Sequence, residues 1–325
     1  DHQNSYYNLA LIKKEQGLYE EAIEFLLMVL DLNPEHSETN YLSWLIYSRL
    51  GQFTEGWKYF EYRWKVSPQN GVIWPIQDKP LWKGERGKRV ALWREQGIGD
   101  EIICLSLVSE VKKMCDSLSV YVDPRLQALC KRAMPGINFV KDVEELQKAE
   151  SDYHLPIQSL GGLIRNDISD FDRTVTGYFK ADPQRVEAIR NELGLGNKTI
   201  IGISWKSLKT KYNTKSVKLH DFERIFSGLD VVLVNLQYGD VDEEIREFKE
   251  ATGIDVVQCT SVDNREDLDG LAALIEVCDL VVSTSNVTIH MAGALAKETW
   301  VLLHYVSIYY WLVERTDSIW YPSLT

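Results

Sequence analysis

The sequence has few of the features that mark secreted or membrane-spanning proteins. It contains five cysteines in 325 residues, an odd number without a CxxC pair, so a disulfide framework is not expected. No apolar run approaches the roughly 18 residues that a membrane-spanning helix needs, since the run at residues 25–32 is short and amphipathic. We therefore expect reduced core cysteines in a cytoplasmic protein without a transmembrane segment. The chain begins at Asp1 rather than Met, so a targeting segment removed upstream stays an open alternative.

Positive charge is also scarce. The 36 Lys and Arg residues are outnumbered by 48 Asp and Glu residues, and the formal net charge is -12. A surface of this sign repels phosphate backbones, so we expect no nucleic-acid partner. A local basic pocket can still bind a small phosphorylated ligand against the overall sign.

Several catalytic and metal-binding motifs are missing. The sequence has no HExxH, no paired His/Cys cluster, no GxxxxGK[ST] loop and no GxSxG elbow. Two acidic triplets, Asp240-Val241-Asp242 and Asp267-Leu268-Asp269, look like DxD metal motifs. Both stand at predicted helix starts, where the helix dipole favours acidic side chains. We therefore predict no metal site and no bound cofactor, with zinc on the cysteines as the alternative.

A repeat with a period of 34 residues opens the chain. Its first copy has Gly17, Tyr19, Ala22 and Pro34, and its second has Gly51, Phe53, Gly56 and Pro68. This period is characteristic of the tetratricopeptide repeat, in which glycine separates two helices and proline ends the second. We expect an all-α module at residues 1–68. Two copies are fewer than the roughly three needed for independent stability, so the module is either a docking surface for a protein or peptide or a structural cap.

Strands alternate with helices after a connector at residues 69–86 that is rich in Pro, Gly and Trp. The predicted strands are residues 89–93, 119–122, 138–140, 152–155, 199–204, 231–237, 255–258, 280–283 and 299–303. The predicted helices are residues 100–114, 124–133, 220–227, 241–250, 265–277 and 287–296. This alternation predicts an α/β protein with two Rossmann-like domains. The first spans residues 87–165, and the second, with its crossover, spans residues 166–325.

The first strand-end motif is Gln96-Gly97-Ile98-Gly99-Asp100. Ligands of open α/β sheets lie outside the carboxyl ends of the strands, and glycines there permit a tight turn into a helix whose amides attract negative groups. The motif is not a dinucleotide fingerprint, because Ile102 stands at the third glycine position. Asp100 either faces the cleft as a functional carboxylate or caps the helix.

The second motif follows the strand at residues 199–204. Five lysines and no acid fall within residues 205–218, a local reversal in an acidic chain. Lysines and hydroxyls at a strand end suit a diphosphate. Lys206, nearest the strand, is the first candidate and Lys215 the second, and a solvated basic loop is the alternative.

The third motif follows the strand at residues 280–283, where the amino end of the next helix is expected to bind phosphate. Gln237, at the end of a neighbouring strand, could read a base or ribose edge. A single histidine in such a helix is more often packed in the core than in contact with a bound molecule. The candidate residues of the turn and helix are Thr284, Ser285, Asn286, Thr288 and His290.

In this order the motifs resemble a known family over nearly the whole chain. They are similar to bacterial tetratricopeptide-repeat proteins whose C-terminal region resembles the ADP-heptose:lipopolysaccharide heptosyltransferases, glycosyltransferase family 9. The pieces that carry the resemblance are Trp93-Arg94-Glu95-Gln96-Gly97-Ile98-Gly99-Asp100, Ile201-Gly202-Ile203-Ser204-Trp205-Lys206, Leu236-Gln237-Tyr238-Gly239-Asp240, Asp279-Leu280-Val281-Val282-Ser283, His290-Met291-Ala292-Gly293-Ala294-Leu295 and the closing Trp311 to Ser323.

The resemblance implies a metal-independent, inverting glycosyltransferase of the GT-B fold. Its substrates would be a nucleotide sugar, bound to the C-terminal domain, and a glycan or protein acceptor against the N-terminal one. Asp100 matches the position of the family's proposed catalytic base, Lys206 would steady the leaving diphosphate, and residues 284–290 would hold the phosphates.

The chain departs from the family pattern in two places. Thr284-Ser285-Asn286 replaces the usual acidic triplet, which predicts a different donor or reduced activity. The chain also stops at Thr325, where relatives continue through one more helix, which predicts C-terminal truncation. The alternatives are a non-catalytic scaffold with a degenerate GT-B body and a nucleotide-sugar epimerase of the same fold. The architecture is also similar to that of repeat-bearing protein O-GlcNAc transferases, which keeps a protein acceptor open.

Overall fold

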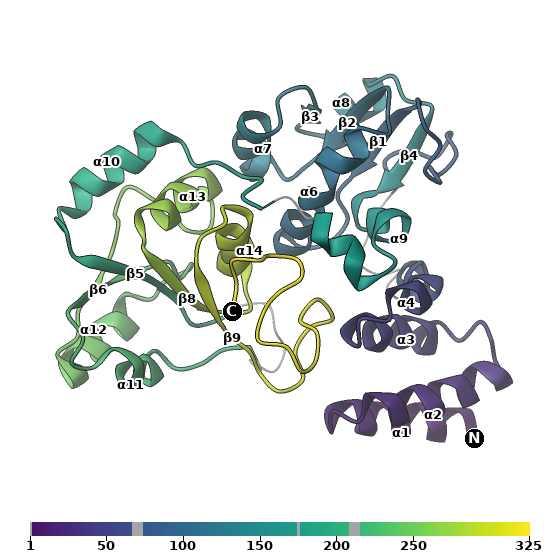
Figure 1. Cartoon of the computed structure of the whole chain (residues 1–325), viewed down its shortest axis with the longest axis horizontal. Coiled ribbons are helices and arrows are strands. Elements are labelled where there is room, and N and C mark those ends of the chain that lie inside the picture. The colour runs from purple at the N-terminus through teal and green to yellow at the C-terminus, as the bar shows by residue number, and fades with distance from the viewer. Residues whose placement is uncertain (1, 67–73, 174–175, 208–214) are drawn as a thin grey trace.

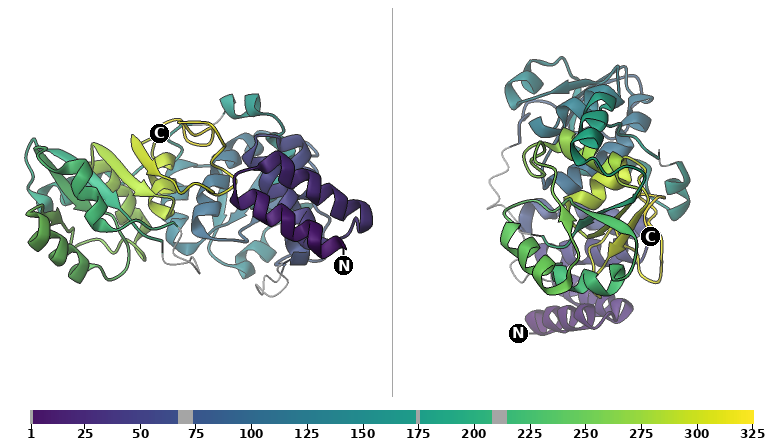
Figure 2. Two further views of the ribbon diagram at one scale, coloured as in Figure 1. Left: turned by 90° about the horizontal axis from the view of Figure 1, so that it is seen from below. Right: turned by 90° about the vertical axis from the view of Figure 1, so that its left-hand side faces the viewer.

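The computed structural model describes residues 2–66, 74–173, 176–207 and 215–325. A helical module is followed by two α/β units, each built on one parallel sheet (Figure 1). The helical module and the second unit lie at opposite ends of the molecule in the left view of Figure 2. Within the described residues, no helix is both long enough and apolar enough to span a membrane.

The helical module consists of two antiparallel helix pairs and a short final helix. Gly17 and Gly51 have φ of +78° and +74° and separate the two helices of each pair, a conformation that favours glycine. Ala10 and Ala22 are fully buried where the first two helices meet, so their small side chains let the two helices pack closely. The helices are α1 (His2–Glu15), α2 (Tyr19–Leu32), α3 (Ser37–Arg49), α4 (Phe53–Phe60) and α5 (Arg63–Val66).

The first α/β unit has a four-stranded parallel sheet in the order β3-β2-β1-β4. Its strands are β1 (Arg89–Trp93), β2 (Ser117–Tyr121), β3 (Asn138–Val140) and β4 (Tyr153–Pro156). Its helices are α6 (Ile98–Lys112), α7 (Gln127–Ala133), α8 (Val143–Lys148) and α9 (Leu160–Ile164), with 3₁₀ turns η2 (Pro124–Leu126) and η3 (Ile157–Ser159). Helices α8 and α9 are absent from the elements predicted above, because both are too short to show a helical period.

The second unit has a five-stranded parallel sheet in the order β7-β6-β5-β8-β9. Its strands are β5 (Thr199–Ser204), β6 (Val231–Asn235), β7 (Val256–Val257), β8 (Leu280–Thr284) and β9 (Thr299–Leu302). Its helices are α10 (Pro183–Leu193), α11 (Glu223–Phe226), α12 (Asp242–Thr252), α13 (Leu268–Val277) and α14 (Val287–Ala294), with η5 (Leu219–Phe222) before α11.

Helix α10 is also absent from the predicted elements, although the sequence marks both of its ends. Asp182 accepts a hydrogen bond from the Gln184 amide as the N-cap, Pro183 occupies the first turn, and Gly194 ends the helix with φ of +59°. These signals at the two ends define the helix, although the pattern of apolar residues between them is only weakly amphipathic. The crossover between the two units therefore ends in a helix rather than in a plain loop.

The strand order reverses between β1 and β4 in the first sheet and between β5 and β8 in the second. Such switch points leave a crevice at the carboxyl ends of the strands, where α/β folds bind ligands. One hydrophobic cluster runs through both units and includes the fully buried Leu105 and Ile289. The packed core is therefore continuous from one unit to the other.

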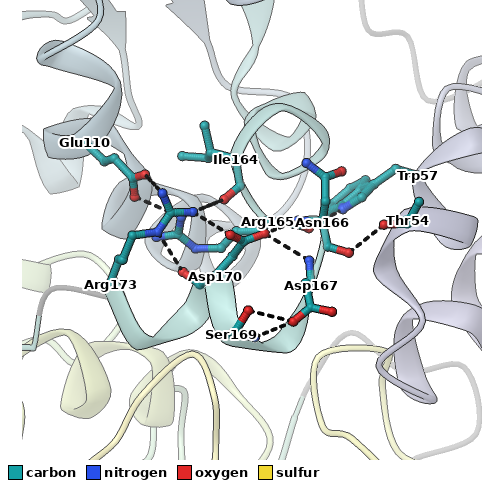
Figure 3. Close-up of polar contacts among 10 residues, drawn as sticks. All are labelled: Thr54, Trp57, Glu110, Ile164, Arg165, Asn166, Asp167, Ser169, Asp170 and Arg173. Atoms are coloured by element: carbon teal, nitrogen blue, oxygen red, sulfur yellow. Dashed lines mark hydrogen bonds and ion pairs between the residues drawn. The ribbon is translucent and has the colours of Figure 1, made fainter.

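The helical module is packed against both units. Trp57 donates to the Arg165 carbonyl at 2.6 Å and Thr54 to the Asn166 carbonyl at 2.8 Å (Figure 3). Arg165 is itself fully buried and paired with Glu110 of α6 at 2.8 Å. The 3₁₀ turn η4 (Ile168–Arg173) of the crossover follows directly, so the second helix pair of the module lies on the segment that joins the units.

The C-terminal segment after β9 returns to the same module. Arg49 of α3 donates to the Tyr305 carbonyl at 3.0 Å and to the Ser307 hydroxyl at 2.7 Å. The Val313 amide donates to the Arg49 carbonyl at 3.2 Å. The Tyr309 ring lies 4.5 Å from the Trp44 ring, centroid to centroid. The second repeat is therefore bonded to the second unit as well as to the first.

Candidate functional site

A cavity of about 520 Å³ lies between the two α/β units, at the carboxyl ends of β1, β5 and β8. Predicted site residues that line it are Gln96, Gly97, Gly99, Asp100, Lys215, Ser285, Asn286 and His290. Lining residues that sequence reasoning did not single out as candidates are Arg94, Ile98, Arg125, Ser207, Tyr238, Asn264, Arg265, Leu268, Val287 and Tyr310. The cavity thus joins the first and third predicted motifs and one lysine of the second.

The loop after β1 forms one wall of the cavity. Gly97 is the N-cap of α6, and Asp100 lies in the first turn of that helix. A Cβ atom on Gly99 would lie 2.7 Å from the His290 ring of α14. This close approach of a helix from each unit requires glycine at position 99.

Two arginines lie on the same side of the cavity. Arg94 pairs with Glu101 at 3.0 Å and with Asp123 at 2.9 Å, and Arg125 pairs with Asp123 at 2.9 Å. Burial raises the pKa of Glu101 to about 7, so this carboxyl compensates the guanidinium charge only in part near neutral pH. Arg125 also donates to the Arg265 carbonyl of the second unit at 3.0 Å. Arg125 follows the end of β2, so its strand-end position was the signal available in the sequence.

The turn after β8 forms the opposite wall. Asn286 caps α14 by accepting from the Thr288 amide at 2.9 Å, and it donates to the Ser204 hydroxyl at 2.7 Å. Ser285 accepts from the Trp311 indole at 2.9 Å. Thr284 and Thr288 are buried and do not line the cavity. The polar side chains of this turn are therefore mostly engaged within the protein.

Gln237 and Lys206 are placed beneath the second wall rather than in the cavity. The Gln237 carbonyl oxygen accepts from the backbone amides of Trp205 and Lys206 at 3.0 and 2.9 Å, and its NH₂ group donates to the Tyr238 carbonyl. The Lys206 ammonium pairs with Glu244 of α12 at 2.6 Å. Both side chains hold the loop after β5, and the ligand contacts that the sequence predicts for them stay predictions.

Lys215 is the lysine of this loop that lines the cavity. Burial lowers the pKa of its ammonium group, whereas the charge of Asp100, which lines the same cavity from the first unit, raises it. Lys209 and Lys211, also part of the predicted basic loop, lie outside the described residues.

His290 is a buried, neutral histidine. Its two ring nitrogens hydrogen-bond the hydroxyls of Tyr321 and Tyr310, at 3.0 and 3.1 Å. Burial, and to a smaller extent the charge of Lys215, lowers its pKa to about 3. The ring therefore does not offer a positive charge to a ligand at pH 7. It fixes Tyr310, which does line the cavity.

Replacement of His290 by glutamine is expected to change the pH dependence of stability. The unfolded histidine titrates near pH 6.5 and the folded one near pH 3, so the unfolded state binds more protons in this range. Stability is thus lost as the pH falls, by about 2 kcal/mol between pH 7 and pH 5 for this group. The free energy of urea unfolding of wild type minus that of the variant should therefore be smaller at pH 5 than at pH 7 by that amount.

Measuring wild type and variant together at each pH separates the contribution of His290 to stability from the contributions of other titrating groups. Glu101, with its raised pKa, gives the opposite dependence, and His154 and His304, with lowered pKa values, give the same one. All three are present in both proteins. A difference that stays constant from pH 7 to pH 5 would show that His290 is not buried as a neutral ring.

The acidic residues of the two DxD-like triplets do not line the cavity, although Leu268 of the second triplet does. Asp267 caps α13 by accepting from the Gly270 amide at 2.9 Å, and Asp242 lies in the first turn of α12. Across residues 2–66, 74–173, 176–207 and 215–325, no three His, Cys, Asp or Glu side chains are grouped so that they could hold a metal ion. Metal independence stays a prediction.

This chain is similar in sequence to a repeat family and to a bacterial protein. Residues 3–36 match the tetratricopeptide repeat family. Protein FlbA of Caulobacter vibrioides is 31% identical over 308 residues, which cover 85% of this chain and 49% of FlbA. The chain therefore spans about half the length of this relative.

The solved structures that resemble the chain include E. coli ADP-heptose lps heptosyltransferase II, with a TM-score of 0.50 and 11% identity over 66% of this chain and 84% of that one. The glycosyl transferase family 9 structure from Veillonella parvula has a TM-score of 0.48 and 13% identity, over 68% and 81%. At such low identity the first of these similarities shows the fold alone. The chain thus joins a tetratricopeptide-repeat module to the two-unit α/β architecture of GT-B proteins, in the arrangement that the sequence predicts.

Proposed function

We propose that this protein is a glycosyltransferase that moves a sugar from a nucleotide-diphosphate donor to a hydroxyl group of a glycan or protein acceptor. The observation that carries the proposal is the inter-unit cavity, which is lined by Asp100 from the first unit and by Lys215 and the amino end of α14 from the second. A base and an anion-binding group on opposite walls are the two elements that such a transfer needs.

The reaction proposed is a single displacement with inversion. Asp100 takes the proton of the acceptor hydroxyl, whose oxygen attacks the anomeric carbon of the donor. The bond from that carbon to the diphosphate oxygen breaks, and the diphosphate leaves with the bonding electrons. Lys215 and the amides at the start of α14 offset the charge that grows on it. This displacement requires neither a metal ion nor a bound cofactor.

The sugar transferred in this proposal is a hexosyl or a heptosyl group. The E. coli relative in fold is named for ADP-heptose, which supports a nucleotide-sugar donor. In this chain, Ser285 and Asn286 are bonded to Trp311 and Ser204, so we expect the donor to be read by other groups. Tyr238, Asn264 and Arg265 line the same side of the cavity. The cysteines are free thiols, the state expected of the cytoplasmic location that we propose.

Nucleotide binding tests the proposal directly. A thermal-shift screen of UDP, GDP, ADP, CMP and their sugars should find a ligand that raises the melting temperature by mass action. Lys215→Ala should weaken that ligand about 10- to 100-fold, the scale of a lost charge-assisted hydrogen bond. Lys206→Ala should have a smaller effect, because its ammonium is paired with Glu244.

Lys249→Ala is the matched control, since Lys249 is an exposed residue of α12 paired with Asp255 at 2.8 Å. It should leave nucleotide affinity unchanged. Equal affinity of wild type and Lys215→Ala would remove Lys215 from the site. Binding of no nucleotide by the folded protein would end the proposal as a whole.

A non-catalytic scaffold is the second candidate, favoured by the internal bonding of Ser285 and Asn286. The first repeat leaves Ile12 and Leu32 more than half exposed, and a peptide or protein could dock there. A scaffold would bind no nucleoside diphosphate. An epimerase of the same fold would convert the donor with no acceptor present, which analysis of the sugar nucleotide after incubation with the protein alone detects.

A further inference from the structure

Arg63 of the helical module makes a buried ion pair with Glu95 of the first α/β unit. Its Nε and Nη2 atoms donate to the two carboxylate oxygens at 2.8 and 3.0 Å. Nη2 also donates to the Ser159 hydroxyl at 2.8 Å, and the guanidinium carbon lies 3.8 Å from the centroid of the Phe60 ring. The two side chains are 4% and 1% exposed.

This pair holds the loop that carries the proposed base. Glu95 lies two residues beyond the end of β1 and five before Asp100. Its neighbour Arg94 is held by Glu101 and Asp123. Consecutive side chains of the loop are thus held by different partners, one in the helical module and the other in the first unit.

The module also brings electrostatic groups close to Asp100. Tyr41 of α3 has a pKa raised by burial and then by the charge of Asp100, whereas Arg63 opposes the shift. The Tyr41 ring stacks on Trp44 at 5.4 Å between centroids. The charge of Asp100 therefore acts on a side chain of the second repeat.

We propose that Arg63 is a positioning residue for sugar transfer, through which the tetratricopeptide-repeat module fixes residues 94–100 and hence Asp100. The inference rests on the proposed function. Acting through Glu95, Arg63 sets the place of the carboxylate relative to the acceptor hydroxyl. Donor binding depends on Lys215 and α14 of the other unit, so the loop can shift without loss of the nucleotide.

Arginine is required at this position for a geometric reason. A guanidinium donates in parallel to both carboxylate oxygens, and a lysine ammonium of similar charge cannot reproduce this fork. Removal of Arg63 alone would leave Glu95 as a buried, uncompensated charge, whereas removal of both charges is tolerated far better. A double variant therefore separates positioning from folding.

The experiment compares Arg63→Met, Arg63→Lys and the double variant Arg63→Met/Glu95→Gln. In each, kcat should fall by about 10- to 100-fold, the scale expected when a reacting group moves by about 1 Å, while nucleotide affinity stays unchanged. Amide hydrogen exchange at residues 94–100 should be faster than in wild type in the ligand-free protein. The smallest change is expected for Arg63→Lys, which keeps the charge.

Arg49→Met is the matched control. Arg49 is a buried arginine of the same module, but it contacts Tyr305 and Ser307 rather than the loop. It should leave exchange at residues 94–100 as in wild type. Unchanged kcat and unchanged exchange in the folded double variant would overturn the inference, as would equal losses of kcat and nucleotide affinity.

Failure of the proposed function gives a different result. Wild type would then bind no nucleotide and transfer no sugar, while the exchange measurement would still report on the loop. Faster exchange in the Arg63 variants together with an inactive wild type would refute the transferase and the catalytic part of this inference. The structural coupling of the module to the loop would stand.

Discussion

Asp100→Asn is expected to lower sugar transfer by about 10²- to 10⁴-fold, the contribution of a positioned general base. The amide has nearly the shape of the carboxylate but cannot accept the proton of the acceptor hydroxyl. Nucleotide affinity should stay close to that of wild type, because Asp100 belongs to the first unit and the donor is proposed to bind the second. The loss should therefore appear in kcat and not in nucleotide affinity.

The measurement is turnover of the donor identified by thermal shift, with nucleotide affinity determined on the same preparations. Asp116→Asn is the control, because Asp116 follows α6 at its far end and does not line the cavity. It should keep full turnover. Full turnover by Asp100→Asn would exclude Asp100 as the base and leave the displacement without one.

The strands were largely predictable from the sequence. Residues 89–93, 138–140 and 199–204 form strands with the predicted bounds. Strands of a parallel sheet are covered on both faces and therefore read as short apolar runs. The two units, their parallel sheets and the preceding helical repeat follow from that pattern and from the 34-residue period.

The start of α6 is a feature that the local sequence pattern did not predict. The helix is predicted from residue 100, with the two glycines in a turn, but it begins at Ile98 with Gly97 as its N-cap. Gly99 lies inside the first turn, where the His290 ring leaves no room for a Cβ atom. That contact joins residues 191 positions apart, and no local pattern reports it.

The cavity residues were predictable only in part for the same reason. Lys206 is nearest the end of β5, which made it the first candidate, but Glu244 of α12 binds its ammonium. Arg125 and Tyr310 reach the cavity from η2, which follows β2, and from the C-terminal segment. Which strand-end groups face a cleft depends on how distant elements pack, and one sequence does not contain that information.

The helical module raises the question of whether it is a separate docking domain or part of the core structure. Its second repeat contacts the first unit, the crossover and the C-terminal segment. Within helix α9, Gly161 and Gly162 both face the Trp57 ring of α4. These adjacent glycines differ in the space around them, which makes them a sensitive test of that packing.

Gly161→Ala is expected to destabilise the protein, whereas Gly162→Ala is expected to be neutral or stabilising. A Cβ atom on Gly161 would overlap the far end of the Trp57 ring, but one on Gly162 would lie at an ordinary 3.5 Å from it. Trp57 cannot move freely, because its indole is bonded to the Arg165 carbonyl and packed edge-on against Phe60.

Overpacking of this kind costs about 1–3 kcal/mol, whereas alanine in place of helical glycine gains about 0.5–1 kcal/mol. Thermal unfolding followed by calorimetry should therefore show a lower melting temperature for Gly161→Ala and an equal or higher one for Gly162→Ala. If the module were an independent docking domain, its contact with α9 would loosen at little cost. The two variants would then unfold at similar temperatures. A clear separation between them requires that the repeats be bound to the α/β body as part of one packed structure.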